Sequence, residues 1–95
     1  MREKEVEAYL VKRVKDLGGK AYKWVSQGND GVPDRIVIMP GGTVIFVELK
    51  APGGKLRPLQ EAKHTELRKL KQTVFVLDDK NKVDAFIKLS ILAGW

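Results

Sequence analysis

Two runs of β-branched and apolar residues, separated by a tight turn, constrain the fold of this chain more than any other feature. Residues 36–39 read Ile-Val-Ile-Met, residues 43–49 read Thr-Val-Ile-Phe-Val-Glu-Leu, and Pro-Gly-Gly lies between them at residues 40–42. Proline fits a type I turn, and glycine fits the left-handed position that closes a three-residue hairpin loop. The segment therefore predicts a β-hairpin in which Met39 pairs with Thr43.

The length of that loop decides which residues of the two strands face each other. A three-residue loop places Asp34 opposite Glu48, so that both side chains lie on one face of the sheet. Lys50 shares that face because side chains alternate along a strand. A two-residue loop would instead pair Asp34 with Leu49 and separate the two acids.

Hydrophobic spacing predicts helices and further strands around the hairpin. The expected order is a helix at 3–17, strands at 21–26, 36–39 and 43–49, a helix at 58–70, a strand at 73–77, and a last helix that begins after Asp79. In the helix at 58–70 the residues expected to point inward are Leu59, Ala62, Leu67 and Leu70. A strand, a helix and another strand in succession imply a right-handed crossover, so the predicted fold class is α/β, a mixed β-sheet flanked by helices.

Amino-acid composition restricts the class of protein and the kind of metal site that we expect. With 95 residues, the chain has room for one core, so we expect residues 1–95 to form a single domain. It contains no cysteine and one histidine, which leaves hard, oxygen-bound metals as the expected kind of metal site. No apolar run is long enough to span a bilayer, and we expect a cytoplasmic protein. The net charge of +6 favours a polyanionic partner such as nucleic acid, although many basic domains are charged for solubility alone.

The two opposed acids carry the chemical prediction. Carboxylates on neighbouring strands, roughly 5 Å apart between Cβ atoms, repel each other at neutral pH unless a cation lies between them. Oxygen ligands, with the backbone carbonyl of Leu49 as a further candidate, suit Mg²⁺ or Mn²⁺. Lys50 beside that ion would stabilise negative charge developing at phosphorus or orient the attacking water. This arrangement is typical of a phosphodiesterase, with Asp34 and Glu48 as its metal ligands.

An isolated Glu-X-Lys sequence is usually only a pair of solvated charges, with Asp34 capping a turn. Here Glu48 and Lys50 end a strongly apolar strand, Val44-Ile45-Phe46-Val47, where an apolar residue is the normal occupant. That context favours a functional site over a solvated strand face.

The same residues resemble a known family. The segments Gly31-Val32-Pro33-Asp34, Phe46-Val47-Glu48-Leu49-Lys50 and Ala51-Pro52-Gly53-Gly54, followed by Gln60, are similar to the VRR-NUC branch of the PD-(D/E)XK nuclease superfamily. The resemblance covers the chain from Glu3 to about Leu77 and implies a restriction-endonuclease-like αβββαβ core with a C-terminal helix. Small stand-alone members are typical of phages and resemble Holliday-junction resolvases, which act as homodimers.

The resemblance also implies roles for individual residues. Asp34 and Glu48 would be metal ligands, Lys50 the catalytic lysine, and Gln60 the glutamine that family members place on the following helix. The superfamily often adds an acid from its first helix. Glu7 is the preferred candidate because it borders the apolar stripe of that helix, and Glu3, one turn earlier on the same side, stays open as the alternative.

His64 receives no role and is expected to be a surface or packing residue. Polar and basic residues flank the loops on either side of the predicted site and are candidates for gripping phosphates. They are Lys23, Ser26 and Gln27 before Asp34, together with Lys55 and Arg57 after Lys50. A scattered solvated face is the alternative for each of them.

The preferred hypothesis is thus a Mg²⁺- or Mn²⁺-dependent endonuclease that hydrolyses DNA. Structure-specific cleavage of branched DNA is one form of this activity, and single-stranded and duplex DNA stay open as substrates. The main alternative is a non-catalytic basic module that binds nucleic acid, and a third is an interaction domain built on a decayed nuclease fold. The apolar C-terminal helix, with Ile91, Leu92 and Trp95, suggests a homodimer, but the same helix could simply pack across the sheet.

Overall fold

The computed structural model describes residues 1–95 as a four-stranded mixed sheet with three helices. The elements are α1 (Glu3–Asp16), β1 (Lys20–Lys23), β2 (Arg35–Ile38), β3 (Val44–Leu49), α2 (Pro58–Lys69), β4 (Thr73–Leu77) and α3 (Lys80–Ala93). The predicted fold class and element order are confirmed. The first strand is shorter than expected because pairing with β2 ends where Lys23 faces Arg35.

The hairpin has the predicted register. The strand order is β1-β2-β3-β4; β2 pairs antiparallel with both neighbours, and β4 pairs parallel with β3. In the turn, Met39 N–H donates to the Thr43 carbonyl at 3.0 Å, and Gly42 adopts φ +94°, the left-handed conformation that glycine tolerates. Because Arg35 pairs with Val47, the next residues outward, Asp34 and Glu48, face each other.

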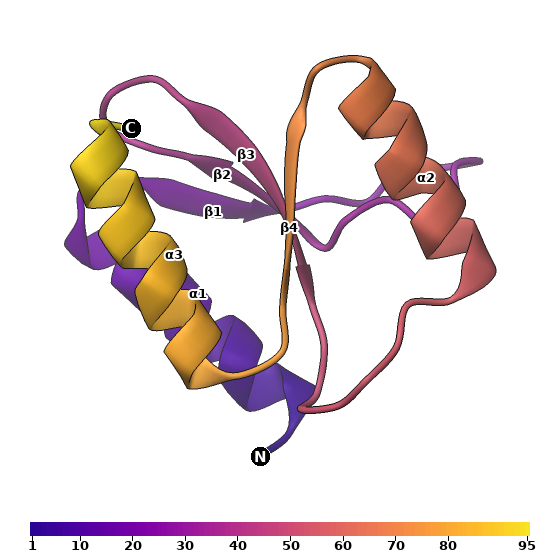
Figure 1. Cartoon of the computed structure of the whole chain (residues 1–95), viewed down its shortest axis with the longest axis horizontal. Helices are drawn as coiled ribbons and strands as arrows, with labels where there is room; N and C mark the ends of the chain where they lie inside the picture. The colour runs from indigo at the N-terminus through magenta and orange to yellow at the C-terminus, as the bar shows by residue number, and fades with distance from the viewer.

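The helices divide between the two sides of the sheet. Figure 1 shows β4 between the pair α1 and α3 on one side and α2 on the other. The side of α1 and α3 holds the hydrophobic core, because the alternate residues Val37, Ile45, Val47 and Leu49 of the strands point toward these helices. The helices contribute Val6, Leu10, Val14, Val83, Phe86 and Ile87. The core therefore lies on one side only.

The orientation predicted for α2 is wrong. Leu59 and Leu70 are 61% and 65% exposed, whereas the buried residues of this helix are Gln60 and His64. The helix begins at Pro58, which suits a first turn, and Gln60 accepts from the Arg57 backbone N–H at 2.9 Å. The polar face of α2 therefore packs against the sheet, where Gln60 contacts the buried Glu48 of β3.

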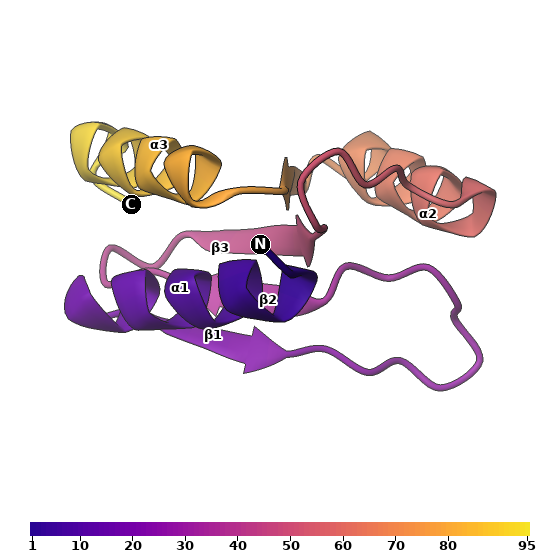
Figure 2. The ribbon, with the colours of Figure 1, turned by 90° about the horizontal axis from the view of Figure 1, so that it is seen from below.

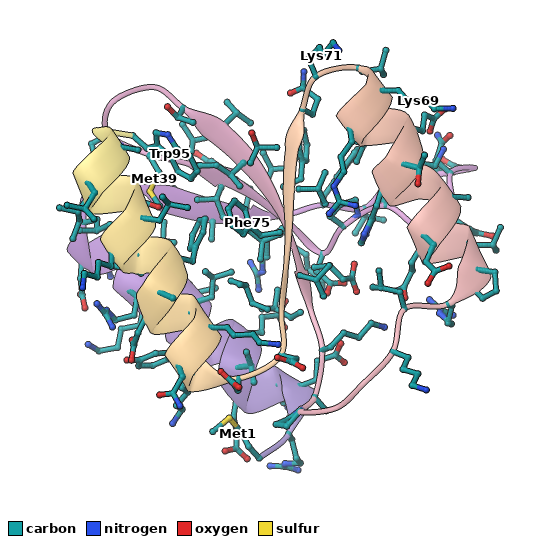
Figure 3. The ribbon with its side chains drawn as sticks, in the orientation of Figure 1. Met1, Met39, Lys69, Lys71, Phe75 and Trp95 are labelled. Atoms are coloured by element: carbon teal, nitrogen blue, oxygen red, sulfur yellow. The ribbon has the colours of Figure 1, made fainter.

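Helix α3 begins as predicted, with the Asp79 side chain accepting from the Lys82 backbone N–H at 2.7 Å. The residues at the C-terminal end of α3 and just beyond it are divided between core and surface. Trp95 packs edge-on against Phe75 at 6.2 Å between ring centroids, near Met39 (Figure 3), while Leu92 is 76% exposed. None of the helices is long and apolar enough to cross a membrane.

Candidate metal-binding and catalytic site

The two predicted acids meet at the end of the central strands. Glu48 is the next-to-last residue of β3 and is 1% exposed, and Asp34 directly precedes β2. Asp34 Oδ2 accepts from the Leu49 backbone N–H at 2.9 Å, which holds the aspartate against the end of β3. Asp34 and Glu48 thus come together as their register requires.

The third acid of the group is Glu3 rather than Glu7. One carboxylate oxygen from each of Glu3, Asp34 and Glu48 lies within 4.8 Å of the other two. Glu7 instead forms an ion pair with Arg35, its Oε2 lying 3.0 Å from Nε. Arg35 follows Asp34 and so points to the opposite face of the sheet, where it draws Glu7 away from the other carboxylates.

The group has the electrostatics of a cation site. Burial, and then the neighbouring Asp34 carboxylate, raise the pKa of Glu48 to about 8. Glu48 Oε1 is buried without a hydrogen-bond partner. Hard divalent cations take carboxylate oxygens, and a cation would compensate both the repulsion and the unpartnered oxygen. The donor set therefore fits such an ion, and Asp34, Glu48 and Glu3 are the side chains able to hold it.

Two predicted residues approach Glu48 from different elements. Lys50 comes from the chain just beyond β3, and its Nζ lies 3.9 Å from Glu48 Oε2. Gln60 lies in the first turn of α2, and its Nε2 donates to the same oxygen at 3.1 Å. The lysine is only 15% exposed, so it stays close to the acids instead of extending into solvent.

His64, which sequence reasoning left without a role, is also part of this surrounding. It is 0% exposed, and its Nε2 lies 3.8 Å from Glu48 Oε1. Burial, and then the nearby Arg68, lower the pKa of His64, which favours the neutral form of the imidazole. Gln60 and His64 are four residues apart, the spacing that puts two side chains on one helix face. That spacing was the one signal in the sequence that could have identified His64.

The loop before Asp34 is fixed against α2. Figure 2 shows the long connection between β1 and β2 extending past the strand ends toward α2. A Cβ atom on Gly31 would lie 2.3 Å from the Leu59 carbonyl oxygen, and Gly31 has φ +89°. Only glycine allows this approach, which ties the loop that carries Asp34 to the helix turn that carries Gln60.

The residues predicted to grip phosphates do not all lie equally near the acids. Arg57 directly precedes α2 and lines, with Asp30, Gly31 and Leu59, a surface hollow of about 550 Å³. Lys23, Gln27 and Lys55 are exposed, and Ser26 accepts from Asn29 Nδ2 at 3.1 Å within the loop. Their placement leaves contact with a substrate as a proposal.

Comparison with known proteins identifies the family of this chain. Residues 3–80 match the family model of the VRR-NUC domain. "Putative nuclease p44" of Acyrthosiphon pisum secondary endosymbiont phage 1 is 49% identical over 81 residues, which are 85% of this chain and 87% of that protein. A solved structure described as a VRR_NUC domain superposes with a TM-score of 0.85 at 37% identity, covering 90% of this chain and 94% of the other. The chain therefore belongs to the VRR-NUC domain family.

Proposed function

We propose that this protein is a metal-dependent endonuclease that hydrolyses phosphodiester bonds of DNA. The observation that carries the proposal is the convergence of Glu3, Asp34 and Glu48 within 4.8 Å, with Lys50 beside them. Membership of the VRR-NUC family and the phage relative named as a nuclease support the same reaction class. Nucleic acid also suits the net charge of +6.

Mg²⁺ or Mn²⁺ bound here would act as a Lewis acid on the scissile phosphate and make a bound water more acidic. Residues of the chain are placed to bind the ion, to stabilise charge and to hold the ligands in position. Asp34 and Glu48, with the Leu49 carbonyl as a further candidate, offer the oxygen ligands, and Glu3 replaces Glu7 as the proposed acid from α1. Lys50 is placed to stabilise negative charge that develops on the phosphate oxygens, while Gln60 keeps Glu48 in position.

The cleavage assay uses single-stranded, duplex, flap and four-way DNA with Mg²⁺ or Mn²⁺, and maps every cut. Asp34→Ala and Lys50→Ala should each lower the cleavage rate by roughly 1,000-fold or more, because the first removes a ligand of the metal ion and the second removes the positive charge proposed to stabilise the reacting phosphate. Both variants should still bind DNA in Ca²⁺. Lys69→Ala is the matched control, because it removes one positive charge at the end of the molecule far from Met1 and the neighbouring Glu3 (Figure 3), and it should cut at the wild-type rate.

An absence of cleavage on every substrate with either ion would reject the enzyme and leave the basic binding module as the better description.

The five residues predicted to contact phosphates are tested one at a time for their effect on DNA binding. Arg57→Ala should weaken DNA binding most, because Arg57 lines the hollow beside Gln60, and Lys23→Ala, Ser26→Ala, Gln27→Ala and Lys55→Ala should have smaller effects.

Symmetric cutting of branched DNA requires two sites, and we propose that a second copy of the chain supplies the other. Ile91 and Leu92 support this, because they are 59% and 76% exposed on α3. Trp95 contributes less than its sequence suggested, since it packs against Phe75. Sedimentation of wild type and of Ile91→Lys with Leu92→Lys measures this directly; a monomeric wild type at micromolar concentration contradicts it.

A further inference from the structure

His64 differs from every other buried residue of the helices in that its two polar atoms have no partner. Nδ1 and Nε2 are both buried without a hydrogen bond, and so is Glu48 Oε1, the atom that Nε2 faces at 3.8 Å. Buried polar atoms in folded proteins are nearly always hydrogen-bonded. His64 Nε2 and Glu48 Oε1 face each other without a hydrogen bond. This indicates that the arrangement is completed only when a further group binds nearby.

The Glu48 carboxylate can accept a second hydrogen bond from α2. Each carboxylate oxygen has two lone pairs, so one on each oxygen can accept from α2 while the other faces the remaining acids. Gln60 already donates to Oε2 at 3.1 Å. His64, one turn later on the same helix face, stands opposite Oε1.

We infer that His64 is a positioning residue, whose Nε2–H donates to Glu48 Oε1 when a divalent cation is bound and fixes that carboxylate toward Asp34 and Glu3. The inference rests on the proposed function and adds a residue to it. Carboxylates that bind metals are commonly oriented by such outer hydrogen bonds.

The chain offers a direct observation of this bond. Because His64 is the only histidine, its imidazole nitrogen and proton resonances are assigned without ambiguity. During a Mg²⁺ titration, we expect Nε2 to keep its proton and that proton to move downfield as the hydrogen bond shortens. Loss of the Nε2 proton, with direct coordination of the ion, overturns the inference, as does an imidazole signal that does not change.

Variants separate positioning from packing. His64→Leu keeps similar volume and removes the donor, and His64→Gln places an amide N–H at a comparable reach. We expect His64→Leu to weaken Mg²⁺ binding roughly 10- to 100-fold and to lower kcat with an unchanged KM for DNA. His64→Gln should restore most of both, and the thermal unfolding of both variants without metal reports whether they fold.

Ser90→Ala is the matched control, since Ser90 is a buried polar residue of α3 on the other side of the sheet and bonds the Phe86 carbonyl at 2.8 Å. It should leave Mg²⁺ affinity unchanged. If wild type binds Mg²⁺ and cleaves DNA while His64→Leu matches it within twofold, only the role of His64 is rejected. If wild type neither binds Mg²⁺ nor cleaves, the proposed function fails and this inference fails with it.

Discussion

The two sides of the sheet are covered by helices that use opposite chemistry to pack. On one side α1 and α3 bury Val6, Leu10 and Phe86 against alternate strand residues. On the other side α2 buries only Gln60 and His64, and both face Glu48. The first side therefore provides most of the stability, while the second is shaped around a carboxylate that an apolar helix could not accommodate.

Substitution of Glu48 should have the largest effect of the changes that test this difference between the two sides. Glu48→Gln keeps the shape of the side chain and removes its charge, so cleavage should fall by at least about 1,000-fold, because an amide is a poor ligand for a hard cation. Thermal unfolding without metal should occur at a higher temperature than in wild type, because the buried carboxylate is costly there. A variant that keeps its cleavage rate would contradict the assignment of Glu48.

The apolar side is probed with Leu10→Ala, a change within the core. Leu10 is fully buried, so its truncation should lower the free energy of unfolding by about 3 kcal/mol through lost burial and the cavity left behind. Leu70→Ala is the same substitution at an exposed position at the end of α2, away from the proposed dimer surface, and should change that free energy by less than about 0.5 kcal/mol. Denaturant titration measures both, and equal losses would undo the comparison.

The polar side should also reveal itself through pH. The pKa of Glu48 is about 8 in the folded protein, above the ordinary value of 4.5 for this side chain, so folding favours the protonated form. With a chelator present, the free energy of unfolding should be highest below pH 4.5 with respect to this group and should fall on the order of a few kcal/mol as pH rises to 8. Glu48→Gln should lack this component, and an identical pH profile in both proteins would be the contrary result.

The smallest expected effect concerns the loop that joins the two halves of the site. Gly31→Ala should lower the free energy of unfolding by about 1–3 kcal/mol, because its φ is +89° and its Cβ would meet the Leu59 carbonyl. Gly28→Ala has a similar φ, +78°, with open space around it. The control therefore carries the conformational strain alone, and Gly31→Ala should additionally reduce Mg²⁺ affinity by disturbing Gln60.

The sequence predicted the parts of the site that depend on local rules. The turn at residues 40–42 fixed the hairpin register, and the register brought Asp34 opposite Glu48. The sequence did not show whether Glu3 or Glu7 would lie beside Asp34 and Glu48, because both lie on one side of α1. Glu7 is held away by its ion pair with Arg35, which lies on a strand distant in sequence. Helical spacing alone could not reveal which residues would pair across space.

The error in α2 has a related cause. Its leucines suggested an apolar inner face, and intrinsic hydrophobicity would normally decide the orientation of such a helix. The buried carboxylate of Glu48 changed the preference, because a polar group inside the protein requires donors more strongly than a surface leucine requires burial. Gln60 and His64 could be recognised as its neighbours only after the position of α2 over β3 was known.

The hydrogen bond from the Leu49 N–H to Asp34 Oδ2 gives this protein a built-in reporter. Any event that alters electron density on that aspartate also alters the shielding and the solvent exchange of one backbone amide. A single cross-peak in an isotope-labelled sample can therefore follow occupancy of the acidic group in real time, without a dye and without turnover.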